Sequence, residues 1–260
     1  MSTPSRRALL RAAEVLNLDS EDLQVERGYL DLVGGEEPRA TGVAQRLMSS
    51  RVVPNIYERW WRPALGRVLK GPTGPSMAQE ERLARDLLAL RGGATVLDVA
   101  CGPGNFTRSF AADVGESGTV IGIDLSAPML ARALDETDAR QVVYVRADAV
   151  ELMIRAESVD AVCCFAALHL FSDPWAALDR MASALVPGGR LAVLTTSRPE
   201  GLPGAMRDLL GRVSGMRMIR GDQLTRELLE RGLEVVHHHV FGLMQIVSAR
   251  RSPNPPQVGA

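Results

Sequence analysis

The chain has 260 residues, of which 46% are hydrophobic and 23% charged, and this ordinary globular composition argues against collagen, coiled-coil and largely disordered classes. Its 30 basic and 31 acidic residues nearly cancel, so no net field would draw the protein to nucleic acid or to an anionic membrane. The single lysine, Lys70, disfavours Schiff-base chemistry, and the three cysteines, Cys101, Cys163 and Cys164, predict a reducing compartment rather than a disulfide scaffold.

The apolar segments are too short or too interrupted for an export signal or a membrane span. Arg6, Arg7 and Arg11 break up the first 18 residues. The longest apolar stretch, Ala161–Phe171, is about half as long as a membrane-spanning helix. We therefore expect a cytoplasmic protein without stable membrane insertion.

The first 93 residues do not show a regular alternation of strand and helix patterns. Residues 41–70 and 76–91 have apolar positions at helical spacing, and Asp22–Val33 has the pattern of a short strand pair. We expect residues 1–93 to form a mainly helical N-terminal cap or lid that does not fold independently. At the other end, Arg250–Ala260 reads as a flexible tail.

Residues 94–249 predict a single α/β domain with a doubly wound, Rossmann-like sheet, because short β-branched runs alternate there with helical patterns. The predicted strands are Thr95–Val99, Val120–Asp124, Val142–Arg146, Ala161–Phe165, Arg190–Thr196, Leu233–Val240 and Leu243–Ala249. The predicted helices are Asn105–Val114, Ala127–Glu136, Trp175–Leu185 and Asp222–Arg231. Pro187-Gly188-Gly189 is expected to end the third of these helices.

The segment Val96–Thr107 reads as a strand, a sharp glycine turn and the start of a helix. Gly102 and Gly104 allow the backbone to pass close under a ligand at the carboxyl end of the first strand. A third glycine of the dinucleotide fingerprint is missing, since Thr107 stands there, and Asp98 precedes the turn. A carboxylate at that point suits a cationic ligand better than a pyrophosphate, although a bare strand–helix turn is the structural alternative.

Two further aspartates follow predicted strands. Asp124 ends the second strand, about 20 residues beyond the glycine turn, where a carboxylate can accept both hydroxyl protons of a ribose. Taken alone, such an aspartate is more often a helix N-cap, here for the segment that begins at Ala127, and its register with Asp98 reverses this preference. Asp148 follows the third strand, where it could accept a hydrogen bond from an adenine amino group. Turn chemistry alone does not explain three successive strands that each carry such an aspartate.

These motifs resemble a known family. The segments Val96–Asn105, Gly122–Asp124, Asp148-Ala149, Cys163–Leu170 and Leu185–Val193 look like a class I S-adenosylmethionine-dependent methyltransferase of the ubiquinone/menaquinone-biosynthesis-like (methyltransferase type 11) small-molecule group. The segment Tyr57–Trp61 is most similar to actinobacterial and photosynthetic-organism members. The resemblance covers about residues 50–250. It implies a seven-stranded sheet in the order 3-2-1-4-5-7-6 with an antiparallel seventh strand.

The resemblance also implies roles for individual residues around S-adenosyl-L-methionine as cofactor. Gly102 and Gly104 would hold its methionine part, and Asp98 would orient the cationic end. Asp124 would bind the ribose, while Asp148 and Ala149 would lie at the adenine. The expected packing residues are Leu125, Met129 and Phe165, with Tyr57 as a further contact from the N-terminal region.

One feature departs from some members of the family. These carry a cysteine-rich zinc segment before a Gly-Tyr-Leu-Asp-Leu stretch, which Gly28–Leu32 matches here, but the first 93 residues contain neither cysteine nor histidine. We therefore expect no metal, and ribosomal RNA methylation becomes less favoured. His237, His238 and His239 do not change this expectation, because two same-face histidines on a strand lack a third ligand.

His169 is the candidate catalytic group, since it follows the fourth predicted strand and has a suitable intrinsic pKa for a general base. The alternative is a histidine that packs under the next helix. Phe165–His169 lacks the Asn/Asp-Pro-Pro-Tyr sequence of enzymes that methylate amino groups of bases or glutamine, so oxygen or carbon is the expected acceptor. Cys163 and Cys164 read as buried structural thiols.

The expected substrate is a hydrophobic small molecule such as a quinone, a polyketide or a lipid-like secondary metabolite. Trp60 and Trp61 would contact it from the N-terminal region, and Met206 and Met216 from the segment 197–221, although core packing explains these side chains as well. The alternatives are a non-methylating cyclase or rearrangement enzyme of the same fold, a cofactor-binding regulator, and RNA methylation. A monomer or a homodimer is expected, without nucleic acid.

Overall fold

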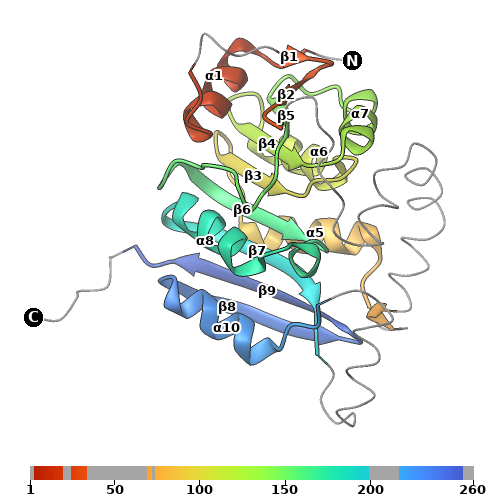
Figure 1. The fold of residues 1–260 in the computed structure, drawn as a ribbon, viewed down its shortest axis with the longest axis vertical. Coiled ribbons are helices and arrows are strands. Elements are labelled where there is room, and N and C mark those ends of the chain that lie inside the picture. The colour runs from red at the N-terminus through yellow and green to blue at the C-terminus, as the bar shows by residue number, and fades with distance from the viewer. Residues whose placement is uncertain (1–2, 20–24, 34–68, 72–73, 199–216, 254–260) are drawn as a thin grey trace, which may run out of the picture.

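The computed structural model describes residues 3–19, 25–33, 69–71, 74–198 and 217–253. Over these ranges the strands form one mixed sheet in the order β1-β2-β5-β4-β3-β6-β7-β9-β8 (Figure 1). The strands are β1 (Val25–Glu26), β2 (Tyr29–Asp31), β3 (Thr95–Val99), β4 (Thr119–Asp124), β5 (Val142–Arg146), β6 (Val159–Phe165), β7 (Leu185–Thr196), β8 (Leu233–Phe241) and β9 (Met244–Arg251).

The seven strands from β5 to β8 confirm the predicted topology. Numbered from β3 as the first strand, their order across the sheet is 3-2-1-4-5-7-6. The strands β3 to β7 pair in parallel, and only β9 runs against its neighbours β7 and β8 within this set. The hairpin of β1 and β2 extends the sheet beyond β5, with β2 parallel to β5. The strand pair predicted within Asp22–Val33 is therefore present, and it is part of the central sheet.

Helices cover both faces of this sheet (Figure 1). Buried side chains of α5, α6 and α7 form one apolar layer with the sheet, and those of α1, α8 and α10 form the other. The helices are α1 (Arg6–Val15), α5 (Met77–Leu88), α6 (Asn105–Val114), α7 (Ala127–Asp135), α8 (Pro174–Ala184) and α10 (Gly221–Glu230). The parallel strands are thus buried on both sides, which is why they read as continuous apolar runs.

Local capping explains where several helices begin. Ser76 and Gln79 form a capping box at the start of α5, and Ser126 caps α7 one residue before a proline-containing first turn. The Asp173 side chain accepts the backbone N–H groups of Trp175 and Ala176 at the start of α8. These caps fix the helix starts close to the positions that the sequence pattern predicts.

The N-terminal helix α1 takes a place on the sheet that the sequence pattern did not assign. The connection from β5 to β6, residues 147–158, carries no helix. The helix α1 packs on the face of the sheet that α8 and α10 also cover, and its Ala8, Ala12 and Val15 side chains are buried. The Arg155 backbone N–H donates to the carbonyl of Val15 at the end of α1. The described part of the N-terminal region is therefore joined to the sheet by core contacts, and its dependence on the rest for folding remains a prediction.

The predicted end of the third domain helix is slightly wrong. The helix α8 stops at Ala184, and Pro187-Gly188-Gly189 lies within β7 rather than before it. The register jumps there, because Val159 pairs with Leu185 whereas Ala161 pairs with Arg190. The glycines accommodate this bulge, as glycine does in many irregular strands. Among the described helices, none is long and apolar enough to span a bilayer.

Candidate cofactor site

The strand order reverses between β3 and β6, because β4 and β5 follow β3 on one side and β6 and β7 lie on its other side. Open α/β sheets bind ligands at such a switch point. The chain following β3 turns toward α6 on one face, and the chain following β6 leads to α8 on the other. Ala100 and Ala166, directly after these two strands, have φ values of +57° and +58°. An alanine rarely adopts this left-handed conformation, so the backbone is strained at both borders of the switch point.

The glycine turn after β3 is joined directly to the end of β4. The Gly102 N–H donates to Asp124 Oδ2 over 2.8 Å, and the Gly104 N–H donates to the Cys101 carbonyl over 3.1 Å. Gly104 has a φ of +79° at the N-cap of α6. The structure therefore brings together the glycine turn and the second predicted carboxylate, as the sequence spacing indicated.

Asp124 is partly exposed, and its carboxylate is held by backbone groups. In addition to Gly102, the Ser126 N–H donates to Oδ1 over 2.8 Å. Burial raises the pKa of this carboxyl above its ordinary value, against the lowering effect of these N–H donors. Each carboxylate oxygen has two lone pairs, so both oxygens retain capacity for a further donor such as a ribose hydroxyl. This acceptor capacity fits the ribose hydroxyls of the predicted ligand.

Asp98 lies deeper than the other aspartates. Its side chain is 2% exposed, and Oδ2 accepts the hydroxyl of the fully buried Thr107 over 2.5 Å. Thr107 occupies the third position of the glycine pattern, and its role as a partner of Asp98 was not predicted. The bond ties the carboxylate of β3 to the first turn of α6, beneath the glycine turn.

The Tyr144 side chain packs against the glycine turn, and this role was not predicted from the sequence. It pairs in register with Gly122, where a Cβ would lie 2.9 Å from its ring, and a Cβ on Gly104 would overlap its hydroxyl oxygen. That hydroxyl lies 2.9 Å from Thr137 Oγ1, whose own proton goes to the Ala133 carbonyl, so Tyr144 is the donor. Glycine is required at 104 and 122 because the Tyr144 side chain fills the space.

Arg108 is a second support that the sequence did not reveal. Its guanidinium donates to the Pro103 carbonyl over 2.6 Å and to Asn105 Oδ1 over 2.7 Å. The same group pairs with Glu136 at the end of α7. The glycine turn is thus held by side chains from α6 and β5, and their spacing in the sequence carries no signal for it.

The other predicted cofactor residues within the described ranges lie at or next to the same edge of the sheet. Asp148 is partly exposed and accepts the Val150 N–H over 2.9 Å, while Ala149 and Leu125 are partly buried. Met129 in the first turn of α7 is 5% exposed. Phe165 ends β6, and its ring meets that of Phe106 edge-on at 5.0 Å between centroids. Their contacts with a ligand remain predictions.

His169 is buried in a short helical turn after β6. Its Nδ1 lies 3.3 Å from the hydroxyl oxygen of Thr195 on β7. Burial lowers the pKa of the imidazole to about 4, so the ring is neutral at physiological pH. A neutral ring can accept a proton, but a pKa this low makes it a weak base, and its catalytic role remains a prediction.

His169 should make stability pH-dependent. The lowered pKa means that the unfolded chain binds a proton below about pH 6.5 while the folded chain resists it down to about pH 4. The free energy of unfolding should therefore fall by about 3 kcal/mol between those values as pH decreases. Urea titrations from pH 7 to pH 4 should show this fall in the wild type and lose it in His169→Gln. The same substitution at the exposed His239 is the control, and an unchanged slope in His169→Gln contradicts the assignment.

The other reactive residues do not form sites within the described part of the chain. Cys163 and Cys164 are fully buried, and burial raises the pKa of both thiols, that of Cys164 to about 12. His237 and His239 lie on β8, and His238 Nε2 lies 3.0 Å from Gln245 Oε1. No group of three or more His, Cys, Asp or Glu side chains there is arranged to hold a metal ion.

The residues predicted to contact the substrate fall outside the described ranges, as does one predicted cofactor contact. These are Tyr57, Trp60, Trp61, Met206 and Met216. The two described residues on either side of the stretch that contains Met206 and Met216 are hydrogen-bonded to each other, since the Arg198 N–H donates to the Ile219 carbonyl over 3.0 Å.

The chain is similar in sequence to known methyltransferases. Residues 97–193 match the family model described as a methyltransferase domain, and this range includes the glycine turn, Asp124, Asp148 and His169. A relative, the 2-phytyl-1,4-naphtoquinone methyltransferase of Thermosynechococcus vestitus, is 36% identical over 121 residues. The match covers 46% of this chain and 54% of that protein. The chain spans about half the length of the curated relatives it matches.

Solved structures have the same fold. The S-adenosylmethionine-dependent methyltransferase of Mesorhizobium loti is 25% identical, with a TM-score of 0.55 over 65% of this chain and 96% of its own. The [4+2]-cyclase SpnF is 20% identical, with a TM-score of 0.61 over 79% of this chain and 97% of its own. At that identity the second comparison speaks for the fold alone.

Proposed function

We propose that the protein is an S-adenosylmethionine-dependent methyltransferase, because residues 97–193 match the family model described as a methyltransferase domain and the sheet has the predicted strand order. The observation that carries the proposal is the bond from the Gly102 N–H to the Asp124 carboxylate at the switch point of the sheet. It joins a turn open to close approach and a carboxylate with free acceptor capacity in one place. When bound there, the cofactor supplies a methyl group on a positively charged sulfur.

The residues of this chain would bind and orient rather than react. Asp124 would accept the ribose hydroxyls, and the turn at Gly102 and Gly104 would pass under the methionine part. Asp98 would act through Thr107, by holding the start of α6 and by placing a negative charge below the turn. Methyl transfer is an in-line displacement, so holding the acceptor in line with the methyl group supplies much of the rate.

We further propose that the acceptor is oxygen or carbon of a hydrophobic small molecule, with a quinone as the first choice. The named Thermosynechococcus relative acts on a naphthoquinone, which supports this class. At the end of β6, the buried His169 is neutral and Phe165 is apolar, which suits an uncharged acceptor. The same proposal includes the similarity to actinobacterial members of the family. It also includes contacts with the cofactor or the substrate from five residues, namely Tyr57, Trp60, Trp61, Met206 and Met216.

Calorimetry and labelled transfer test the proposal in two steps. The wild type should bind S-adenosylhomocysteine in the micromolar range, and failure to bind below millimolar concentration would remove the cofactor assignment. Incubation with methyl-labelled S-adenosylmethionine and a series of demethylated naphthoquinones should then give a labelled product. Binding without label transfer to any quinone would reject the substrate class and leave the cofactor site standing.

The cyclase alternative is not favoured by a specific observation. The cyclase SpnF is only 20% identical to this chain, so the similarity between the two proteins concerns the fold alone. The labelled experiment separates it, since substrate turnover with an unlabelled product is what a cyclase predicts and a methyltransferase does not.

A further inference from the structure

A row of alternating charges crosses the sheet beside Asp124. Asp31 at the end of β2 is the register partner of Arg146 on β5, and Arg146 is in turn the register partner of Asp124 on β4. Residues in register on parallel strands present their side chains to the same face. Arg146 therefore lies between two carboxylates, one from the N-terminal hairpin and one from the proposed ribose site.

Arg146 is directed toward the hairpin and toward the chain that follows Asp124. Its Nη1 lies 3.1 Å from Asp31 Oδ2, and its Nε donates to the Leu125 carbonyl over 3.3 Å. The residue is only 5% exposed, so its charge requires a partner inside the protein. The Asp124 carboxylate meanwhile accepts the N–H groups of Gly102 and Ser126.

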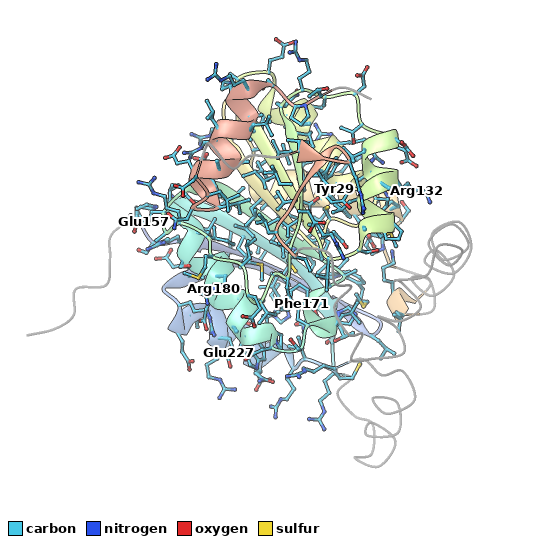
Figure 2. The ribbon with its side chains drawn as sticks, turned by 45° about the horizontal axis from the view of Figure 1, so that its top comes forward. Tyr29, Arg132, Glu157, Phe171, Arg180 and Glu227 are labelled. Atoms are coloured by element: carbon cyan, nitrogen blue, oxygen red, sulfur yellow. The ribbon has the colours of Figure 1, made fainter. Side chains whose placement is uncertain are left out.

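The hairpin that carries Asp31 is itself firmly placed. The Leu32 N–H donates to the Arg146 carbonyl over 2.9 Å, and the Val33 N–H donates to Asp31 Oδ1 over 3.1 Å. Tyr29 is 3% exposed and belongs to the same apolar layer as the buried side chains of α7, the helix that carries Arg132 (Figure 2). A Cβ on Gly28 would lie 2.9 Å from the Leu134 side chain of the same helix. Asp31 is thus presented from a fixed backbone.

We propose that Asp31 is a positioning residue for the cofactor site. It holds the Arg146 guanidinium against the Leu125 carbonyl, and this fixes the chain between Asp124 and Ser126, where the ribose and the adenine bind under the proposed function. The N-terminal hairpin is then a working part of the cofactor site although it touches no ligand. The inference rests on the proposed function, because it assigns these residues to the same ligand.

Calorimetric titration with S-adenosylhomocysteine tests the inference. Asp31→Asn keeps the size of the side chain and removes its charge, and it should weaken binding about tenfold. Asp113→Asn is the matched control, since it breaks another ion pair, with Arg85 Nε 2.5 Å from Asp113 Oδ2, between α5 and α6 and away from the site. It should leave the affinity unchanged. Circular dichroism before each titration establishes that the variant is folded.

A double-mutant cycle shows whether Asp31 acts through Arg146. Asp31→Asn should have no further effect on affinity in the Arg146→Met background, because the group that it positions is gone. Equal binding by Asp31→Asn and the wild type, or full additivity with Arg146→Met, overturns the inference. A wild type that does not bind at all is a failure of the proposed function instead, so the two failures are distinguishable.

A measurement on the wild type alone covers the case in which a variant does not fold. Coupling between sites is reciprocal, so the bound ligand must stabilise the hairpin if the hairpin stabilises the ligand. Saturating S-adenosylhomocysteine should slow hydrogen exchange at the Leu32 amide, which bonds to Arg146, and leave the Gly232 amide after α10 unchanged. Unchanged exchange at Leu32 in a protein that binds the ligand overturns the inference.

Discussion

Replacing Asp124 with alanine should weaken cofactor binding by about 100-fold or more. Each charge-assisted hydrogen bond to a ribose hydroxyl contributes on the order of 1.5–3 kcal/mol, and the substitution removes the acceptor of both. It also leaves the Gly102 N–H without the partner that joins the glycine turn to β4. Calorimetric titration with S-adenosylhomocysteine measures the change directly.

The control for Asp124 is Asp138→Ala, which removes an exposed carboxylate before β5, at the amino edge of the sheet. It should bind like the wild type. The pH dependence adds a second check, because the pKa of Asp124 is raised by burial and the protonated carboxyl accepts poorly. Wild-type affinity should therefore fall as pH decreases through a pKa above the ordinary value of about 3.9. Equal affinity in Asp124→Ala and Asp138→Ala would exclude Asp124 from the site.

Gly104→Ala should destabilise the protein by about 2 kcal/mol or more and impair cofactor binding. The added Cβ would overlap the Tyr144 hydroxyl oxygen, and the φ of +79° is itself unfavourable for alanine. The turn cannot move away easily, since Arg108 holds the Pro103 carbonyl. Urea unfolding measures the loss of stability, and Gly232→Ala is the control, because Gly232 also has a positive φ, of +73°, but nothing within 4 Å of a Cβ.

The overlap with Tyr144 makes a specific prediction about a second variant. Tyr144→Phe removes the hydroxyl that the new Cβ meets, so it should cost less in the Gly104→Ala background than in the wild type. By itself Tyr144→Phe loses the hydrogen bond to Thr137 and should destabilise by about 1 kcal/mol. Simple additivity of the two substitutions would show that the Tyr144 hydroxyl is not what excludes a side chain at Gly104.

Much of the fold follows from local patterns in this chain. The predicted strand Thr95–Val99 and helix Asn105–Val114 agree with the structure at both ends. This is possible because buried parallel strands are continuous apolar runs and helices begin and end at caps and glycines. The link between the glycine turn and Asp124 was also predictable, since both follow strands that are neighbours in a doubly wound sheet.

The supports of the site were not predictable in the same way. Tyr144 reads as one more apolar residue of a buried strand, and only the register with Gly122 shows why both positions have these residues. Arg146 offered a signal, since a charge at the end of an apolar run needs a partner when buried. Its partner Asp31 lies 115 residues away in the chain.

The sequence by itself therefore determined the class of fold, the order of its strands through the family resemblance, and the strand ends where the site lies. The tertiary structure decided how these parts pack: α1 lies on the sheet in the region of the β5–β6 connection, His169 is buried against Thr195, and the N-terminal hairpin is paired to Arg146. The physical reason is that strand and helix patterns arise from neighbours along the chain. Side-chain contacts depend on which strands lie side by side and in what register, and these are set by the packing of the whole molecule.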